Sequence, residues 1–288
     1  MSRQKVSVCI PVYNGEKHIR ETVDSILNQT YRNYELVIVD NCSTDKTDEI
    51  LKSFKDPRLK LFRNNKTVGA AQNWNKCLEH ASGDYIALYH GDDIYYPTIV
   101  EEEITILDKY TKVGAVFTLA EYLNEENIPI KKLDIPKSIE EINILDFKQT
   151  INNTMRHECI FFCPTAMMRK SVLDRVGRFD AESYGFVFDL DMWLRIAQRS
   201  KLCIINKKLM KYRIYSSQGS QALAATGGLE HYKAVDKYLR LDNIGDWFNL
   251  NFLYYSIVKF IKYAAHYLSL KEKIKKILAK HSRRYKTT

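Results

Sequence analysis

Two adjacent carboxylates, Asp92 and Asp93, follow an apolar run that ends at Tyr89. A short apolar run predicts a buried strand, and the intervening Gly91 is typical of a turn at the strand end. In open α/β sheets, ligands bind just beyond the carboxyl ends of the strands. Paired carboxylates at such a place are poorly suited to packing and well suited to holding a divalent cation. Since that cation can hold a diphosphate, the pattern predicts an enzyme that acts on a nucleotide-activated substrate.

Two further polar clusters follow apolar strand patterns. Pro11 and Tyr13 stand at the end of the first pattern, and Asp40 ends the second. A tyrosine ring can stack on a base, and an aspartate can accept a hydrogen bond from a uracil-type imide. Taken alone, Pro11 and Tyr13 are equally compatible with a turn, and Asp40 with a helix cap. Three such clusters on neighbouring strand ends favour a nucleotide site. The sequence after the first strand has no Gly-x-Gly-x-x-Gly, which disfavours a dinucleotide fold.

The elements that must position these residues alternate between strand and helix patterns. Apolar runs predict strands at 6–12, 34–40, 59–62, 85–89 and 113–117, and amphipathic spacing predicts helices at 16–28, 47–54, 70–80 and 98–110. Repeated β-α-β units predict an α/β fold with a mainly parallel sheet sandwiched by helices. Residues 118–160 are patterned less regularly. Short helices are expected at 169–180, closed by Gly177, and at 192–199, followed by a loop at 216–228 and a helical, basic C-terminal extension.

Composition places the chain among ordinary globular proteins. Its 288 residues are 45% hydrophobic and 27% charged, values that point away from the disordered and low-complexity classes. The six cysteines form no Cys-x-x-Cys pair, which disfavours a zinc site and a disulfide framework. An apolar segment typical of a signal peptide is not seen before the first strand, so we expect a cytoplasmic chain with reduced thiols.

The net charge of +9 is concentrated in one segment. Residues 251–288 contain ten Lys and Arg and a single acidic residue, Glu272, so the rest of the chain is balanced. The aromatic stretch at 252–270 is interrupted by Lys259 and Lys262 and is too polar for a membrane span. Residues 252–286 therefore predict docking on an anionic membrane surface at the inner face of the membrane. The alternative is a helix packed on the body with a solvated basic end. Nucleic acid is not expected as a partner, because no recognition motif accompanies the charge.

Taken in order, the motifs resemble those of the family-2 glycosyltransferases, which have the GT-A fold. The resemblance extends over roughly residues 5–215. It rests on the ordered segments 8–14 (VCIPVYN), 37–45 (VIVDNCSTD), 69–75 (GAAQNWN), 81–86 (ASGDYI), 177–180 (GRFD) and 189–195 (DLDMWLR). It implies a GT-A glycosyltransferase domain at 1–215, with residues 216–288 forming the loop and the basic extension.

The resemblance also implies roles for individual residues. Asp92 corresponds to the metal-holding carboxylate of the family's Asp-x-Asp motif, where the metal is Mn²⁺ or Mg²⁺. Asp93 is then a supporting residue, or it caps the helix that follows Pro97. Tyr13 and Asp40 would bind the base of the donor, with Asn73 in the same pocket. The full set of expected nucleotide-binding residues is Pro11, Tyr13, Asp40, Asn73, His90, Gly91, Asp92 and Arg213.

The chain departs from the commonest family pattern at three positions. His90 stands where the family often has Asp, and either contacts the ribose or a phosphate or fills space. Phe188 replaces the Glu of the family's Glu-Asp motif. Tyr215 stands where His is frequent, which puts a second protein metal ligand in doubt. Arg213, two residues earlier, either balances phosphate charge or forms a surface ion pair.

Asp189 is the candidate catalytic base by this resemblance. It follows the apolar residues 185–188, which favour a raised pKa. Such a base accepts the proton of an incoming acceptor hydroxyl, and the family inverts the anomeric centre. The alternative is that Asp189 or Asp191 caps the following helix. The acceptor is expected near residues 157–165 and 216–228.

The sequence therefore predicts an inverting glycosyltransferase that uses a nucleotide-sugar donor, most simply a UDP-sugar. Its acceptor would be a hydroxyl of a glycan or lipid-linked glycan, with bacterial surface polysaccharide synthesis as the setting. One alternative is a non-catalytic nucleotide- or glycan-binding protein of the same fold, which the three departures keep open. A sugar-nucleotide pyrophosphorylase is the other, but it would need a Gly-rich phosphate loop in place of Pro11–Gly15.

Overall fold

A computed structural model of the chain describes residues 6–130, 142–157, 160–215, 229–241, 252–253 and 255–264. Its strands are β1 (Val6–Val12), β2 (Tyr34–Asp40), β3 (Leu59–Arg63), β4 (Tyr85–Leu88), β5 (Ile94–Tyr95), β6 (Val113–Leu123), β7 (Ile142–Leu145), β8 (Ala166–Arg169) and β9 (Lys201–Arg213). Its α-helices are α1 (Ile19–Leu27), α2 (Thr47–Ser53), α3 (Ala70–His80), α4 (Ile99–Lys109), α5 (Phe147–His157), α6 (Lys170–Val176), α7 (Ala181–Tyr184), α8 (Phe188–Ala197) and α10 (Leu229–Leu241). Residues 255–264 are also helical.

The strands form one sheet in the order β3-β2-β1-β4-β8-β6-β9-β5, with β7 paired to β9. The N-terminal half, β3 to β4, is parallel, and its register sets Val12 opposite Asp40 and Cys9 opposite Leu88. Because parallel strands end at the same edge, the residues that follow β1, β2 and β4 lie together. The predicted α/β sheet is confirmed, with β8 running antiparallel to both β4 and β6.

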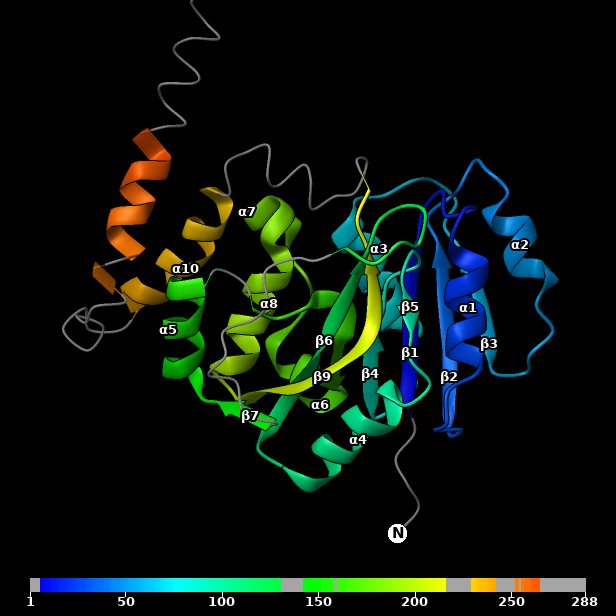
Figure 1. Cartoon of the computed structure of the whole chain (residues 1–288), viewed down its shortest axis with the longest axis horizontal. Helices are drawn as coiled ribbons and strands as arrows, with labels where there is room; N and C mark the ends of the chain where they lie inside the picture. The colour runs from blue at the N-terminus through cyan, green and yellow to red at the C-terminus, as the bar shows by residue number, and fades with distance from the viewer. Residues whose placement is uncertain are drawn as a thin grey trace, which may run out of the picture.

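Helices cover both faces of the sheet, as Figure 1 shows. Alternate residues of β1 point to opposite sides, so Val8 and Ile10 pack with α1 and α4 while Cys9 packs with α3 and α8. Both cores are continuous and apolar, and they account for the near-unbroken apolar runs of β1 and β2. The site residues therefore stand on strands that are buried from both sides.

The predicted elements of the first half are confirmed, most within one or two residues of the predicted ends. Five elements were not indicated by the sequence patterns: the two-residue strand β5, and β7, α5, β8 and the long strand β9 farther along the chain. The predicted strand at 113–117 continues to Leu123 because it pairs with β9 along its whole length. The helix predicted at 192–199 begins earlier, at Phe188, so Asp189 lies in its first turn.

A third core joins the C-terminal part of the described chain to this body. Val235 and Tyr238 of α10 pack with Ile151 of α5 and Leu194 of α8. The predicted loop at 216–228 and the basic segment at 271–286 lie outside the described residues.

Candidate functional site

A cavity of about 600 Å³ opens at the carboxyl ends of β1 and β4. Its walls come from the segment after β1, the start of α3, the loop after β4 and the end of β9. The lining residues are Pro11, Val12, Tyr13, Asn14, Gly15, Glu16, Lys17, His18, Asp45, Ala70, Trp74, His90, Gly91, Asp92, Glu125 and Tyr215. Five of the predicted nucleotide-binding residues thus surround one hollow: Pro11, Tyr13, His90, Gly91 and Asp92.

The acidic turn after β4 is set close against the first strand. A Cβ on Gly91 would meet side-chain atoms of Val12 and Ile19 at 3.3 Å, tighter than most real contacts. Glycine therefore favours the close approach of the turn to β1 and α1, since any larger side chain would have to displace these neighbours. His90, Asp92 and Asp93 each offer one potential ligand atom, and these atoms all lie within 4.8 Å of one another.

Two of these groups carry buried atoms without a hydrogen-bond partner. Nε2 of His90 and Oδ2 of Asp93 are both of this kind, which is rare for buried polar atoms. Burial raises the pKa of Asp93 well above its usual range, and the neighbouring Asp92 charge raises it further. Burial also lowers the pKa of His90, which favours the neutral imidazole that metals bind. Carboxylate oxygens and one imidazole nitrogen fit Mn²⁺ or Mg²⁺, with the imidazole favouring the transition metal.

The end of β9 holds this turn in place. The Arg213 backbone N–H donates to Oδ1 of Asp93 at 2.9 Å, and the Tyr215 phenol donates to Oδ2 of Asp92 at 2.7 Å. The Arg213 guanidinium is buried and bonds the Asp92 carbonyl, Glu21 and, at 2.8 Å, Asn127. It therefore supports the turn from behind, and because the guanidinium is buried, the ion pair that it forms with Glu21 is not the surface ion pair weighed from the sequence. Its role in balancing phosphate charge stays a prediction. Asp93, likewise, does not cap the helix after Pro97, since its carboxylate faces β9.

The base-binding prediction concerns the segments after β1 and β2. Tyr13 presents its ring to the cavity and is 51% exposed. Asp40 is buried, where its carboxylate pairs with Arg63 and accepts from the Ser43 N–H at 3.0 Å. It thus closes a turn, whereas α2 begins only at Thr47. The role of Asp40 in binding a base stays a prediction.

Asn73 lies inside the protein rather than on the cavity wall. Its amide nitrogen donates to the Val39 carbonyl at 3.2 Å, and its oxygen accepts from Asn64 at 2.9 Å. These bonds tie α3 to β2 and to the segment after β3. The structure thus gives Asn73 a supporting position beside the predicted base pocket.

Asp189 lies in the first turn of α8 and does not cap it, since Val187 holds the cap position. Burial raises the pKa of Asp189 to about 6, although the Leu190 N–H and the Cys163 thiol donate hydrogen bonds to its carboxylate. The expectation of a raised pKa is confirmed. The alternative of Asp191 as a cap is wrong, because Asp191 is buried in an ion pair with Arg195 at 2.7 Å.

Trp74 joins the Asp189 region to the acidic turn. Its ring centroid is 5.2 Å from that of His90 and 4.8 Å from that of Phe188, the neighbour of Asp189. Phe188, which replaces the family's Glu, therefore forms part of an aromatic wall beside the cavity. Asp189 itself is not among the residues that line the cavity, and its role as the base stays a prediction. A carboxyl with a pKa near 6 is suited to accepting a proton at neutral pH.

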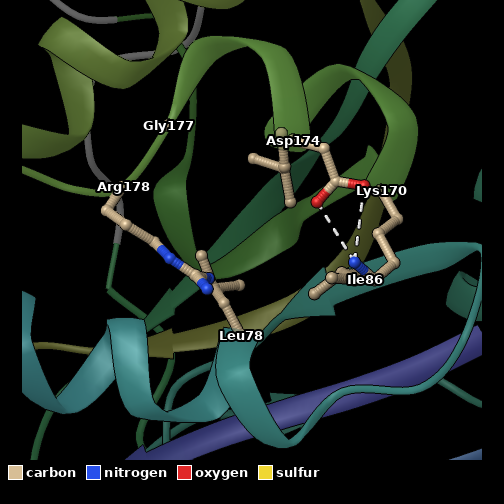
Figure 2. Close-up of a pocket in the computed structure, with 7 residues that line it drawn as sticks. Leu78, Ile86, Lys170, Asp174, Gly177 and Arg178 are labelled. Atoms are coloured by element: carbon tan, nitrogen blue, oxygen red, sulfur yellow. Dashed lines mark hydrogen bonds and ion pairs between the residues drawn. The ribbon is translucent and has the colours of Figure 1, made fainter.

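A second, smaller cavity of about 150 Å³ lies between α3, α6 and the sheet (Figure 2). Lys170 and Asp174 form an ion pair at its rim, 3.1 Å apart, above Leu78 and Ile86. It contains none of the predicted site residues.

Comparison with known proteins agrees with this geometry. Residues 7–177 match the model of the family described as glycosyl transferase family 2. This chain is a family-2 glycosyltransferase. It is 31% identical over 233 residues to an uncharacterized glycosyltransferase of Rickettsia typhi, covering 80% of this chain and 70% of the relative. An uncharacterized glycosyltransferase of Methanocaldococcus jannaschii is 30% identical over 220 residues, covering 74% and 72% of the two chains.

Solved structures share the GT-A fold of this glycosyltransferase. A crystal structure of S. aureus TarS 1-349 in complex with UDP-GlcNAc superposes with a TM-score of 0.65 at 19% identity, over 80% of this chain and 64% of that one. The mannosyltransferase PcManGT of Pyrobaculum calidifontis, solved with GDP-Man and Mn²⁺, gives a TM-score of 0.61 at 20% identity, over 93% and 70%. At this identity the likeness establishes the fold.

The structure of the glycosyltransferase adds cavity residues that the sequence motifs did not single out. Lys17, His18 and Glu125 line the cavity, and Lys17 pairs with Glu125 at 2.9 Å. Lys17 and His18 come two and three residues after the Pro11–Gly15 segment, so their closeness in sequence to the end of the first strand was the available signal. Glu125 comes from the turn after β6, which only the long-range pairing of β6 and β9 brings here.

Proposed function

We propose that this glycosyltransferase transfers a sugar from a nucleoside-diphosphate donor, a UDP-sugar, to a hydroxyl of a glycan with inversion at the anomeric carbon. One observation carries the proposal: the His90, Asp92 and Asp93 cluster opens onto the same cavity as the exposed ring of Tyr13. A cavity with a cation site at one wall and a stacking surface at another suits a nucleoside diphosphate.

The donor nucleotide would lie across the ends of β1 and β4. Tyr13 would stack on the base, and Asp40 would accept the imide hydrogen of a uracil, a group that distinguishes UDP from CDP. Lys17, at the cavity wall, is placed to balance diphosphate charge in the role that the sequence assigned to Arg213. Its present partner, Glu125, is exposed, so exchanging that ion pair for a phosphate costs little.

Asp92, with support from Asp93 and His90, would hold Mn²⁺ or Mg²⁺. When bound, the cation neutralises the negative charge that develops on the departing diphosphate. The unpartnered oxygen of Asp93 and nitrogen of His90 support this assignment, since a cation would satisfy both.

Asp189 would act as the base. The acceptor hydroxyl loses its proton to the Asp189 carboxylate while its oxygen forms a bond to the anomeric carbon. The bond from that carbon to the diphosphate oxygen breaks on the opposite face, and the nucleoside diphosphate leaves with the electron pair. The raised pKa of Asp189 favours this role over that of a purely structural carboxylate, which folding usually leaves paired or exposed. A non-catalytic relative of the fold would have no need of such a group.

The acceptor we propose is a growing bacterial surface glycan. This assignment rests on the family resemblance alone.

Calorimetric titration tests the donor site. Wild-type protein is titrated with UDP, GDP, CDP and dTDP, each with and without Mn²⁺. We expect UDP to bind only when metal is present, and Asp92→Asn to abolish this metal-dependent binding. Asp24→Asn serves as the matched control, because Asp24 is an exposed acid on α1 outside the cavity. Failure of all four nucleotides to bind with metal present would overturn the donor site.

Transfer is tested separately from binding. Asp189→Asn should keep metal-dependent UDP binding. The rate at which the variant releases UDP from its sugar donor should fall about 10²-fold or more, because the acceptor hydroxyl loses its base. Unchanged turnover in this variant would remove Asp189 from the base role while leaving the donor site intact.

A further inference from the structure

The helix at 255–264 and the preceding residues 252–253 present an apolar face to solvent. Leu253, Ile257, Phe260 and Ile261 are between 51% and 74% exposed, and their spacing of four, three and one places them on one side of a helix. Scattered exposed apolar residues are ordinary, but a contiguous stripe of large ones marks an interaction surface. We call these four residues the apolar stripe.

The opposite side of the same helix is fixed to α10. Tyr255 is buried, and its phenol donates to Asp236 of α10 at 3.0 Å. Lys259 forms an ion pair with the same carboxylate, and Tyr232 packs against the Tyr255 ring with centroids 5.2 Å apart. Because these contacts fix the rotation of the helix about its own axis, the apolar stripe on the opposite side faces solvent.

α10 is in turn fixed to the catalytic body. The Tyr238 phenol donates to Oδ1 of Asp191 on α8 at 2.7 Å, within the core that α5, α8 and α10 share. Figure 1 shows the last helix, in orange, at the outer end of the molecule beside α10 and far from β3. The apolar stripe thus lies on the side of the protein that carries Asp189.

The positive charge of the segment around the apolar stripe indicates which kind of partner binds it. Residues 251–288 carry ten Lys and Arg and one acidic residue, whereas the rest of the chain is balanced. A second copy of the chain would bring two such segments together, and their repulsion opposes self-association. An anionic lipid surface offers apolar depth for the stripe and negative charge for the basic residues at once. Among the described residues, no helix has the length and apolar character needed to cross a bilayer.

We propose that the apolar stripe docks this protein into the interface of an anionic lipid membrane. Docking there would turn the α8 side of the protein, with Asp189, toward the bilayer, where a lipid-linked acceptor would present its hydroxyl. The consequence for the acceptor rests on the proposed function, whereas docking itself does not.

Vesicle co-sedimentation tests the docking. The full chain is mixed with vesicles of phosphatidylcholine alone or of equimolar phosphatidylcholine and phosphatidylglycerol. We expect binding only to the anionic vesicles. Ile261→Asp should weaken that binding about tenfold or more, because it removes an inserted side chain and adds a like-signed charge. Ile128→Asp is the matched control, since both isoleucines are 58% exposed and Ile128 lies outside the stripe. Circular dichroism of both variants verifies that they fold.

Three results would overturn the proposal. The first is no binding of wild-type protein to anionic vesicles. The second is equal binding of Ile261→Asp and the control to anionic vesicles, which would show that the basic residues alone account for membrane binding. The third is a concentration-dependent dimer in analytical ultracentrifugation that Ile261→Asp dissociates, which would assign the stripe to a second copy. UDP binding is measured on the same samples, so failure of docking and failure of the donor site are distinguished.

Discussion

The phenol of Tyr215 donates a 2.7 Å hydrogen bond to the Asp92 carboxylate, across a sequence separation of 123 residues. Two residues earlier, the Arg213 N–H bonds the neighbouring Asp93. The end of β9 therefore orients both carboxylates of the acidic turn. Tyr215 replaces the His frequent in the family, and in the proposed cation site it would act by positioning the Asp92 carboxylate.

Removing the Tyr215 hydroxyl tests this positioning. Tyr215→Phe keeps the ring but frees the Asp92 carboxylate to rotate, so we expect Mn²⁺ affinity to fall about tenfold, as losses of outer hydrogen bonds to metal ligands do. Mn²⁺ titration monitored by paramagnetic relaxation measures it directly. Tyr212→Phe, on the same strand, should leave the affinity unchanged. Equal affinity in wild type and Tyr215→Phe would show that packing alone orients Asp92.

As the proposed base, Asp189 would set the pH profile of transfer through its pKa. Burial raises this pKa to about 6, and a base acts only when ionised. The turnover rate should therefore rise with pH, with a slope of one below about 6 and a plateau above it. Steady-state kinetics at saturating donor and metal measure the profile. A plateau that persists below pH 5 would contradict an essential base with this pKa.

The same group makes stability depend on pH. Its folded pKa of about 6 exceeds the ordinary value of 3.8, so the folded state favours the neutral acid. The contribution of neutral Asp189 to the free energy of unfolding is fully present below the ordinary pKa of 3.8, and it is lost as pH rises through 6. Above that, burial of the charge costs about 3 kcal/mol at most. Urea unfolding should find Asp189→Asn more stable than wild type at pH 8 and equal to it near pH 4. An equal difference at both pH values would show that the effect is unrelated to ionisation.

Gly91 tests the tight fit of the acidic turn. A Cβ in Gly91→Ala would press on Val12 and Ile19 at 3.3 Å, which should cost about 1–3 kcal/mol of stability and displace Asp92. Metal-dependent UDP binding, measured by calorimetry, should fall about tenfold or more as a result. Gly69→Ala is the control, because its Cβ meets nothing within 4 Å. If Gly91→Ala binds UDP with the affinity of the wild type, the turn accommodates a Cβ without displacing Asp92.

The Tyr238–Asp191 hydrogen bond tests how α10 is attached. Tyr238→Phe removes a bond to a buried carboxylate, which should cost about 1.5–3 kcal/mol in urea unfolding. Tyr13→Phe, which alters a half-exposed ring, should change stability by less than about 0.5 kcal/mol. If the two variants lose equal stability, the Tyr238–Asp191 hydrogen bond makes no net contribution to holding α10.

The sequence by itself determined the parallel half of the fold and the location of the site. The strands at 6–12, 34–40 and 85–88 are apolar because helices cover both faces of the sheet, so their ends are visible as polar residues after apolar runs. Parallel pairing then requires those ends to share an edge, which places Tyr13 and Asp92 around one cavity. Local patterns were sufficient here because each strand and helix has its own hydrophobic period.

Only the tertiary structure decided what supports these residues. β9 mixes buried and exposed positions without strict alternation, since it pairs with β5, β6 and β7 along different parts of its length. Sequence patterns therefore did not reveal it, nor the bonds that Arg213 and Tyr215 make to the acidic turn. The positive charge of Arg213, read from the sequence alone, is as compatible with a phosphate partner as with Glu21. Contacts between residues more than a hundred positions apart depend on the packing of the whole sheet, and local periodicity carries no information about them.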